Sequence, residues 1–182
     1  GSEIRERQKL LMDDMDLKVE DRPVVLPARE YAERKKSENP RYTNVVVVAI
    51  ELDDGTVVTG RSSRRMVAAA AAILNAVKIM SGIADEIHLL SPKLLETIQN
   101  LKTDVLRADK SSLNCEEVLT TLTISAATNP VSEVALNKLG ELRGCKAHCT
   151  AILSDRDEKT LKSLGIDITS DPEYVTNNLY FG

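Results

Sequence analysis

A β-hairpin that leads into an apolar helix is the feature that most constrains the fold. Residues 50–80 read IELDDGTVVTGRSSRRMVAAAAAILNAVKIM. The Asp53-Asp54-Gly55 turn is expected to join a strand at 44–52 to a strand at 56–59, because glycine supplies the positive φ that this turn needs. The helix that follows, to about Met80, is apolar on nearly every side and is therefore expected to be largely buried.

The segment between hairpin and helix is the strongest candidate for a binding site. It reads Thr59, Gly60, Arg61, Ser62, Ser63, and either serine can cap the helix. A helix start offers unpaired N–H groups and the positive end of the helix dipole, which together favour an anion. Two interpretations remain open here, a site for a small anionic ligand and an ordinary N-cap.

The rest of the chain alternates helices and strands. Further strands are expected at 86–90, 146–153 and 166–169, and helix starts at Ser91-Pro92, Asn114, Asn129-Pro130 and Ser154. This order predicts an α/β fold, a three-layer sandwich whose mixed, mostly parallel sheet has four or five strands, one of them antiparallel.

Parallel strands end at the same edge of a sheet, and open α/β sheets keep their ligands at that edge. Ser91 and Ser154 are therefore expected to lie near the 59–63 segment and to share its ligand. Asn129 is a further candidate for ligand binding, although its position before Pro130 is also explained by helix capping alone.

Residues 1–43 are expected to form a helical arm and linker, and residues 44–182 the α/β core domain. The arm has helical periodicity over Glu3–Met15, an extended segment at Val24–Leu26, a helix from Pro27 to Lys36 and a turn-rich linker at 37–42. The amphipathic lead-in and the alanine run at 68–72 lead us to expect self-association into a homo-oligomer.

Composition excludes several classes of function. The net charge of −4 argues against a nucleic-acid surface, and the 3% of aromatic residues argues against base stacking. No apolar run reaches the ~20 residues of a membrane span, and no secretory signal is recognisable, so we expect a cytoplasmic protein without a membrane partner. The three cysteines are expected to be reduced, buried thiols.

Cys145 and His148 are the candidate catalytic residues, as a nucleophile and a general base. The alternative is that both simply pack within a strand. A metal site is not expected, because His148 and Cys149 would point to opposite faces of a strand. Cys145 and Cys149 would share a face but lie roughly 13 Å apart, too far for one zinc ion.

Several segments resemble the C-terminal part of a bacterial family of unknown function. They are DRPVVLPAREYA, IELDDGTVVTG, EIHLLSP, IQNLK, TISAATNP, LRGCKAHCTAILS, DEKTLKSLGID, DPEY and NLYF. The family is domain of unknown function family 1846, also called uncharacterised protein family 0371. Where its members typically read Cys-x-Ala-His-Ser-Thr, this chain has Cys149 in the serine position.

The resemblance implies a longer parental protein, whose N-terminal part carries a glycine-rich segment similar to a phosphate-binding loop. A nucleotide would then be a cofactor of the parental protein, and none is identified in this chain, which has no GxxxxGK[ST] motif. The preferred function is binding of a small anionic or phosphate-bearing ligand. The alternative is part of a hydrolase or transferase active site completed by the N-terminal domain.

The order of elements also looks like the cytidine-deaminase-like fold. Those enzymes need H-x-E and P-C-x-x-C at two helix starts. Here the corresponding positions hold Gly60-Arg61-Ser62-Ser63 and Ser91-Pro92-Lys93. The sequence therefore excludes zinc-deaminase chemistry while allowing the topology.

Overall fold

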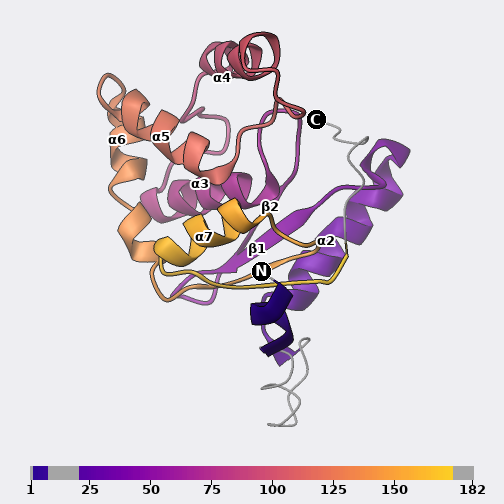
Figure 1. Cartoon of the computed structure of the whole chain (residues 1–182). Coiled ribbons are helices and arrows are strands. Elements are labelled where there is room, and N and C mark those ends of the chain that lie inside the picture. Colours follow the sequence, from indigo (N-terminus) through magenta and orange to yellow (C-terminus); the bar gives the residue numbers. More distant parts are fainter. Residues whose placement is uncertain (1, 8–20, 174–182) are drawn as a thin grey trace.

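The computed structural model describes residues 2–7 and 21–173, and a four-stranded mixed sheet forms its centre (Figure 1). The strands are β1 (Val47–Glu51), β2 (Val57–Arg61), β3 (Lys146–Cys149) and β4 (Asp167–Ser170). Their order across the sheet is β2-β1-β3-β4, with β1 antiparallel to both neighbours and β3 parallel to β4. The predicted α/β fold, the hairpin and the single reversed strand are confirmed.

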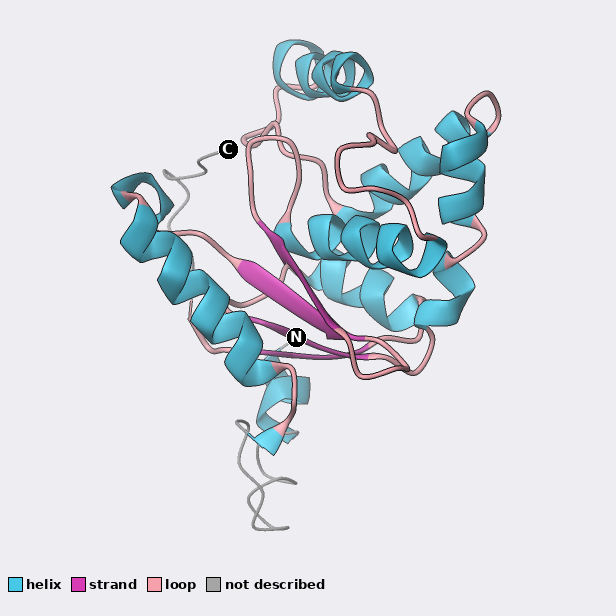
Figure 2. Cartoon of the chain, turned by 180° about the vertical axis from the view of Figure 1, so that it is seen from behind, coloured by secondary structure: helices cyan, strands magenta, loops and turns pink. Residues whose placement is uncertain are grey.

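Helices cover both faces of this sheet (Figure 2). In chain order they are a helical segment at 2–7, α2 (Val25–Glu38), the 3₁₀ helix η2 (Pro40–Tyr42), α3 (Ala68–Ser81), α4 (Pro92–Asn100), the π-helix η3 (Leu101–Val105), α5 (Cys115–Ala126), α6 (Pro130–Leu136), the 3₁₀ helix η4 (Leu139–Leu142) and α7 (Asp155–Ser163). Among the helices described, none has both the length and the apolar character that crossing a bilayer requires.

The alternation of side chains along β1 explains the two layers of helices. Val47 and Ala49 pack in a small cluster with α2, whereas Val48 and Ile50 join the main core cluster with α3. Successive side chains of a strand point to opposite faces, so a strand covered on both sides reads as a continuous apolar run. The VVVVAI run at 45–50 has this character.

The N-terminal lead-in packs against the sheet more closely than predicted. The expected extended segment at Val24–Leu26 is wrong, because α2 already begins at Val25 and accommodates Pro27 in its first turn, where no intrahelical N–H bond is lost. Val24 and Ala28 are fully buried in the cluster with β1. The domain boundary at residue 43 stays a prediction, and the part of the predicted Glu3–Met15 helix beyond residue 7 lies outside the described residues.

The strand predicted at 86–90 is wrong. This segment is a turn, and the Lys78 ammonium group donates to the carbonyls of Asp85 and Ile87 at 2.6 Å each. Leu89 and Leu90 are buried in the main core cluster, so this segment contributes apolar side chains instead of strand pairing. The place beside β1 that it could have taken is occupied by β3.

The strand predicted at 146–153 is also shorter than expected. β3 ends at Cys149, and the chain then leaves the sheet to reach Ser154, which caps α7 as predicted. The short strand predicted at 166–169 is confirmed as β4, one residue further along.

The start of α3 differs from the prediction in a way that matters for the site. The helix begins at Ala68, and neither Ser62 nor Ser63 caps it. The hairpin ladder instead continues past Arg61, since the Ser62 N–H donates to the Val46 carbonyl at 2.8 Å. Ser62 therefore belongs to the end of the hairpin.

The alanine run packs inside the chain. Ala68, Ala69, Ala70 and Ala72 are buried in the main core cluster, where α3 crosses β2. A Cβ atom built on Gly60 would lie 2.1 Å from the Ala72 nitrogen, so only glycine permits this approach. The run is therefore no surface for a second copy, and self-association stays a prediction without this support.

Candidate functional site

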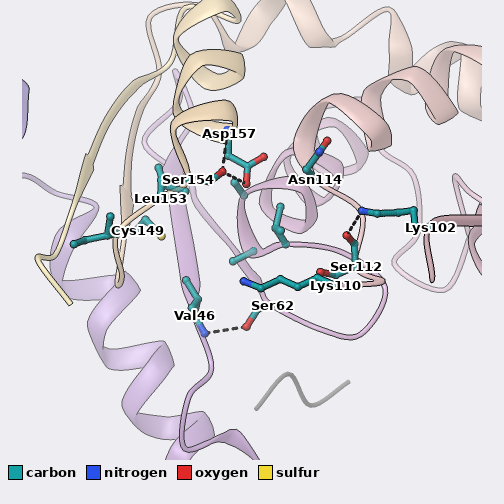
Figure 3. A pocket seen from close by; sticks show the side chains of 14 residues that line it. Val46, Ser62, Lys102, Lys110, Ser112, Asn114, Cys149, Leu153, Ser154 and Asp157 are labelled. Carbon is teal, nitrogen blue, oxygen red and sulfur yellow. Dashed lines mark hydrogen bonds between the residues drawn. The ribbon is translucent and has the colours of Figure 1, made fainter. Parts of the chain in front are cut away.

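A pocket of about 430 Å³ lies at the edge of the sheet where β2 and β3 end (Figure 3). We call it the edge pocket. Its walls come from the end of β2, the start of α3, the 102–114 segment, the end of β3 and the start of α7. This volume lies within the range of roughly 300–1,000 Å³ that is common for small-molecule sites.

Two of the predicted site residues, Ser62 and Ser154, line the edge pocket. Their convergence follows from the shared direction of β2 and β3, as expected for strand ends at one edge of a sheet. The other predicted ligand residues lie outside the pocket lining: Thr59, Gly60, Arg61, Ser63, Ser91 and Asn129.

The predicted residues outside the pocket have local structural roles. The Arg61 guanidinium lies over the ring of Tyr42, 5.0 Å from its centroid. The Ser63 hydroxyl accepts from the backbone N–H groups two and three residues further on. Ser91 and Asn129 cap α4 and α6 through their side-chain oxygens. Because 86–90 is not a strand of the sheet, Ser91 does not reach its edge.

The start of α3 carries no side-chain cap. Val67 is the N-cap residue, with extended backbone and an apolar side chain. Within the described residues, no acceptor is present for the N–H groups of Ala68, Ala69 and Ala70. Ala68 and Ala69 line the edge pocket, so unpaired donors and the positive end of a 14-residue helix face it.

The 102–114 wall of the pocket is joined to the segment before α3 by a short β-bridge of two backbone hydrogen bonds. Leu113 donates to the Arg65 carbonyl at 2.8 Å and accepts from the Val67 N–H at 3.0 Å. This bridge places Ser112, which is 8% exposed, in the pocket lining. The Ser112 side chain thus contributes a hydroxyl group to the pocket lining.

Two lysines line the edge pocket and differ in their surroundings. The Lys102 ammonium group donates to the Ser112 carbonyl and to a Glu117 carboxylate oxygen, both at 2.7 Å, and so fixes the wall. In Figure 3 the Lys110 side chain extends across the pocket in the direction of Ser62. The positive charge of Lys110 therefore lies on the side where the hairpin ends.

The carboxylate in the pocket lining is engaged in the structure around it. Asp157 is 5% exposed and accepts from the Cys115 N–H at 2.9 Å and from the Ser154 hydroxyl at 3.0 Å. Both of its oxygens are used in joining the start of α7 to the start of α5. We therefore assign Asp157 a structural role at the far wall of the pocket.

Cys149 contributes a neutral sulfur to the lining. Its side chain is buried at the end of β3, and burial raises the pKa of this thiol to about 12. The thiolate is the nucleophilic form of cysteine. At neutral pH, Cys149 is therefore a small apolar wall residue.

Cys145 and His148 are not brought together. Cys145 is buried in the main core cluster on the α3 side of the sheet, and burial raises the pKa of its thiol. His148 is fully buried and bonds to groups on the α2 side, and neither residue lines the edge pocket. The geometry provides no contact between this candidate nucleophile and base.

The His148 ring joins three elements through hydrogen bonds. Its Nε2 lies 3.0 Å from Asp171 Oδ1, and its Nδ1 lies 2.7 Å from the Thr169 hydroxyl. The same carboxylate accepts two hydrogen bonds from the Arg29 guanidinium on α2, at 2.7 and 3.2 Å. Burial raises the pKa of Asp171, but the hydrogen bonds from His148 and Arg29 outweigh it and lower this pKa to about 2.

Within residues 2–7 and 21–173, no group of three or more histidine, cysteine or acidic side chains is placed to hold a metal ion. The donors around the edge pocket are backbone N–H groups, hydroxyls and ammonium groups. Such a set suits an anion, because a carboxylate or phosphate accepts from all three kinds of donor.

The fold and the pocket define an α/β domain with a ligand-sized, donor-lined pocket at the carboxyl edge of its sheet. Residues 20–180 match the family model described as "Domain of unknown function DUF1846, C-terminal". The chain belongs to this family.

Curated relatives agree with this assignment. A UPF0371 protein of Clostridium botulinum strain Langeland is 54% identical over 175 residues, which cover 96% of this chain and 35% of the relative. A UPF0371 protein of Clostridioides difficile strain 630 is 49% identical over 176 residues, covering 97% of this chain and 35% of the relative. The chain thus spans about a third of the length of the relatives it matches, and these names state no activity.

Sequence reasoning missed the 102–114 wall of the pocket. Lys102 lies in η3, and Lys110 and Ser112 lie in the polar loop between η3 and α5. No local pattern marks these three as site residues. Their position depends on the bridge from Leu113 to the segment before α3, more than 40 residues earlier. The sequence offered one signal for this wall. It is the polar loop that ends in the capping box of Asn114 and Glu117.

Proposed function

We propose that this domain binds a small anionic or phosphate-bearing ligand in the edge pocket. The observation that carries the proposal is the start of α3, which has no side-chain cap and whose first N–H groups face a pocket that Ser112 also lines. Helix N-terminal N–H groups and hydroxyls that line one pocket suit a ligand that accepts hydrogen bonds, and the helix dipole favours an anionic one.

Lys110 and Ser62 also line the proposed site. Lys110 adds a positive charge, and the Ser62 oxygen accepts from the Val46 N–H at 2.9 Å, which leaves its own proton for a ligand. The proposed site thus retains Ser62 and Ser154 of the sequence-based prediction. Residues 59–61 and 63 of that prediction are not part of the proposed site. The start of α3 at Ala68 and residues 110–112 take their place.

Binding experiments with inorganic phosphate and AMP as probes test this function. We expect both to raise the melting temperature of the domain and to give measurable heats in titration calorimetry. Lys110→Met and Ser112→Ala should each weaken binding, the lysine variant by about tenfold, as expected for a lost charged hydrogen bond of roughly 1.5 kcal/mol.

Lys146→Met is the matched control. Lys146 is exposed at the opposite end of β3, so its removal changes the net charge equally without altering the pocket. The proposal is contradicted when neither probe binds, or when Lys110→Met and Lys146→Met weaken binding equally. The second result would show a general charge effect.

The alternative of a hydrolase or transferase site remains a proposal for the longer protein. Its catalytic groups would have to come from outside this chain, because Cys145 and His148 lie apart and outside the pocket. The same proposal includes a nucleotide as the cofactor, bound by the N-terminal part of the longer protein.

For the fold, we propose a three-layer sandwich, supported by α2 on one face of the sheet and α3 on the other. The chain order of helix, hairpin, helix, strand, helix and strand supports a cytidine-deaminase-like topology, in which α4, α5 and α6 would be an insertion between α3 and β3. We also propose a cytoplasmic location, because the cysteines are buried, unbridged thiols, which a reducing compartment preserves.

A further inference from the structure

An exposed apolar face lies on the helical unit formed by α4 and η3. Leu101, Val105 and Leu106 are 47%, 68% and 64% exposed. They are spaced four and five residues apart in a π-helix, where the Leu106 N–H donates to the Leu101 carbonyl, so they lie on one side. We call these three residues the η3 face.

The η3 face is directed away from the rest of the domain. Figures 1 and 2 show α4 standing off the sheet and its other helices. The unit is attached from its other side, where Leu95 is buried, Gln99 donates to the Arg64 carbonyl and Lys102 bonds to the pocket wall. Nothing in the described residues covers the η3 face.

Three neighbouring large aliphatic side chains in water are an unfavourable arrangement and typically mark a contact surface. The charges nearby are mixed, with Asp104 and Arg107 on the same segment. A lipid surface would be matched by a concentration of basic residues, which this segment lacks. A protein surface is therefore the better match.

We propose that the N-terminal part of the full-length protein packs on the η3 face. The chain matches the C-terminal domain of its family and covers only 35% of the two relatives above, so the full-length protein has a large additional part, which we assign to this face. Leu101 directly precedes Lys102, which lines the edge pocket. Docking here would bring the N-terminal part to the pocket wall, and ligand sites often lie at domain interfaces.

Hydrogen exchange of the full-length protein, this domain preceded by the N-terminal part that its relatives carry, tests the proposal. The variant is Val105→Lys with Leu106→Lys, and the control is Ile124→Lys, an equally exposed apolar residue on α5. We expect the double variant to raise initial deuterium uptake severalfold in peptides of the N-terminal part. The control should leave their uptake unchanged.

Peptides of β1 and β3 report whether the core remains folded, and Leu101→Ser with Leu106→Ser is a second variant should the lysines disturb η3. Unchanged uptake in the N-terminal part in both double variants overturns the proposal. An equal increase in Ile124→Lys also overturns it. An increase that disappears on tenfold dilution of the protein assigns the face to a second copy of the chain, and again overturns the proposal.

Discussion

At the scale of residues, buried polar side chains have different roles in the fold and in the proposed site. His148 is fully buried, and both of its ring nitrogens have partners, as a structural histidine requires. Ser112 is 8% exposed and lines the edge pocket. His148 therefore has a structural role, whereas Ser112 is part of the anion site that we propose.

Asp171 is expected to make stability depend on pH. Its pKa is lowered from 3.8 to about 2 in the folded state, because the hydrogen bonds from His148 and Arg29 outweigh burial. A lowered folded-state pKa stabilises the protein above the unfolded-state value and loses this effect as pH falls from about 4 to about 2. The contribution at neutral pH is at most roughly 2 kcal/mol.

Urea unfolding of Asp171→Asn from pH 7 to pH 2.5 measures this effect. The variant should be less stable at pH 7 by up to about 2 kcal/mol and should lose less stability on acidification than the wild type. Asp167→Asn is the control, because that carboxylate is exposed and forms only a surface ion pair with Arg22. Parallel pH curves for wild type and Asp171→Asn would refute the assignment.

Capping residues were the most predictable part of the sequence at this scale. Ser91, Asn114, Asn129 and Ser154 all cap helices as expected, because a cap is set by a few neighbouring residues. The prediction that Ser62 caps α3 was wrong, because Ser62 pairs with Val46 at the end of the hairpin. The spacing of residues in the sequence does not reveal this contact.

At the scale of elements, β2 and α3 cross in close contact. Gly60 lies against the backbone of Ala71 and Ala72, and the alanine run on α3 lets the helix approach the strand. The same approach sets the position of the α3 start relative to the end of β2. It therefore positions the donors of the edge pocket.

Gly60→Ala is expected to destabilise the domain by about 3 kcal/mol or more, since the added methyl group would meet helix backbone that cannot move alone. Thermal or urea unfolding measures the loss. Gly140→Ala is the matched control, because an added Cβ there meets nothing within 4 Å. Similar stabilities of the two variants would show that β2 and α3 can separate at little cost.

Elements with strong local sequence patterns were predictable. Elements that depend on which segment pairs with a given strand were not. The hairpin, α3 and α7 follow from turn chemistry, apolar periodicity and caps. The segment at 86–90 has strand-like composition, but β3 takes the position beside β1 and the segment buries Leu89 and Leu90 instead. Pairing partners are chosen across the whole chain, and one segment does not encode that choice.

At the scale of the whole molecule, the edge pocket follows from topology. β2 and β3 run in the same direction, so the chain leaves both at one edge and the following helices start there. This much was predictable from the order of elements. The 102–114 wall was not, because it depends on the bridge between Leu113 and the segment before α3.

The central claim is that the start of α3 receives an anion. Titration of the ¹⁵N-labelled domain with inorganic phosphate, followed by amide NMR, tests it most directly. The account predicts that the largest saturable shift changes occur at Ala68, Ala69 and Ser112, and that Lys110→Met weakens the titration. Saturable shifts centred elsewhere, or none at these amides at millimolar phosphate, would contradict it.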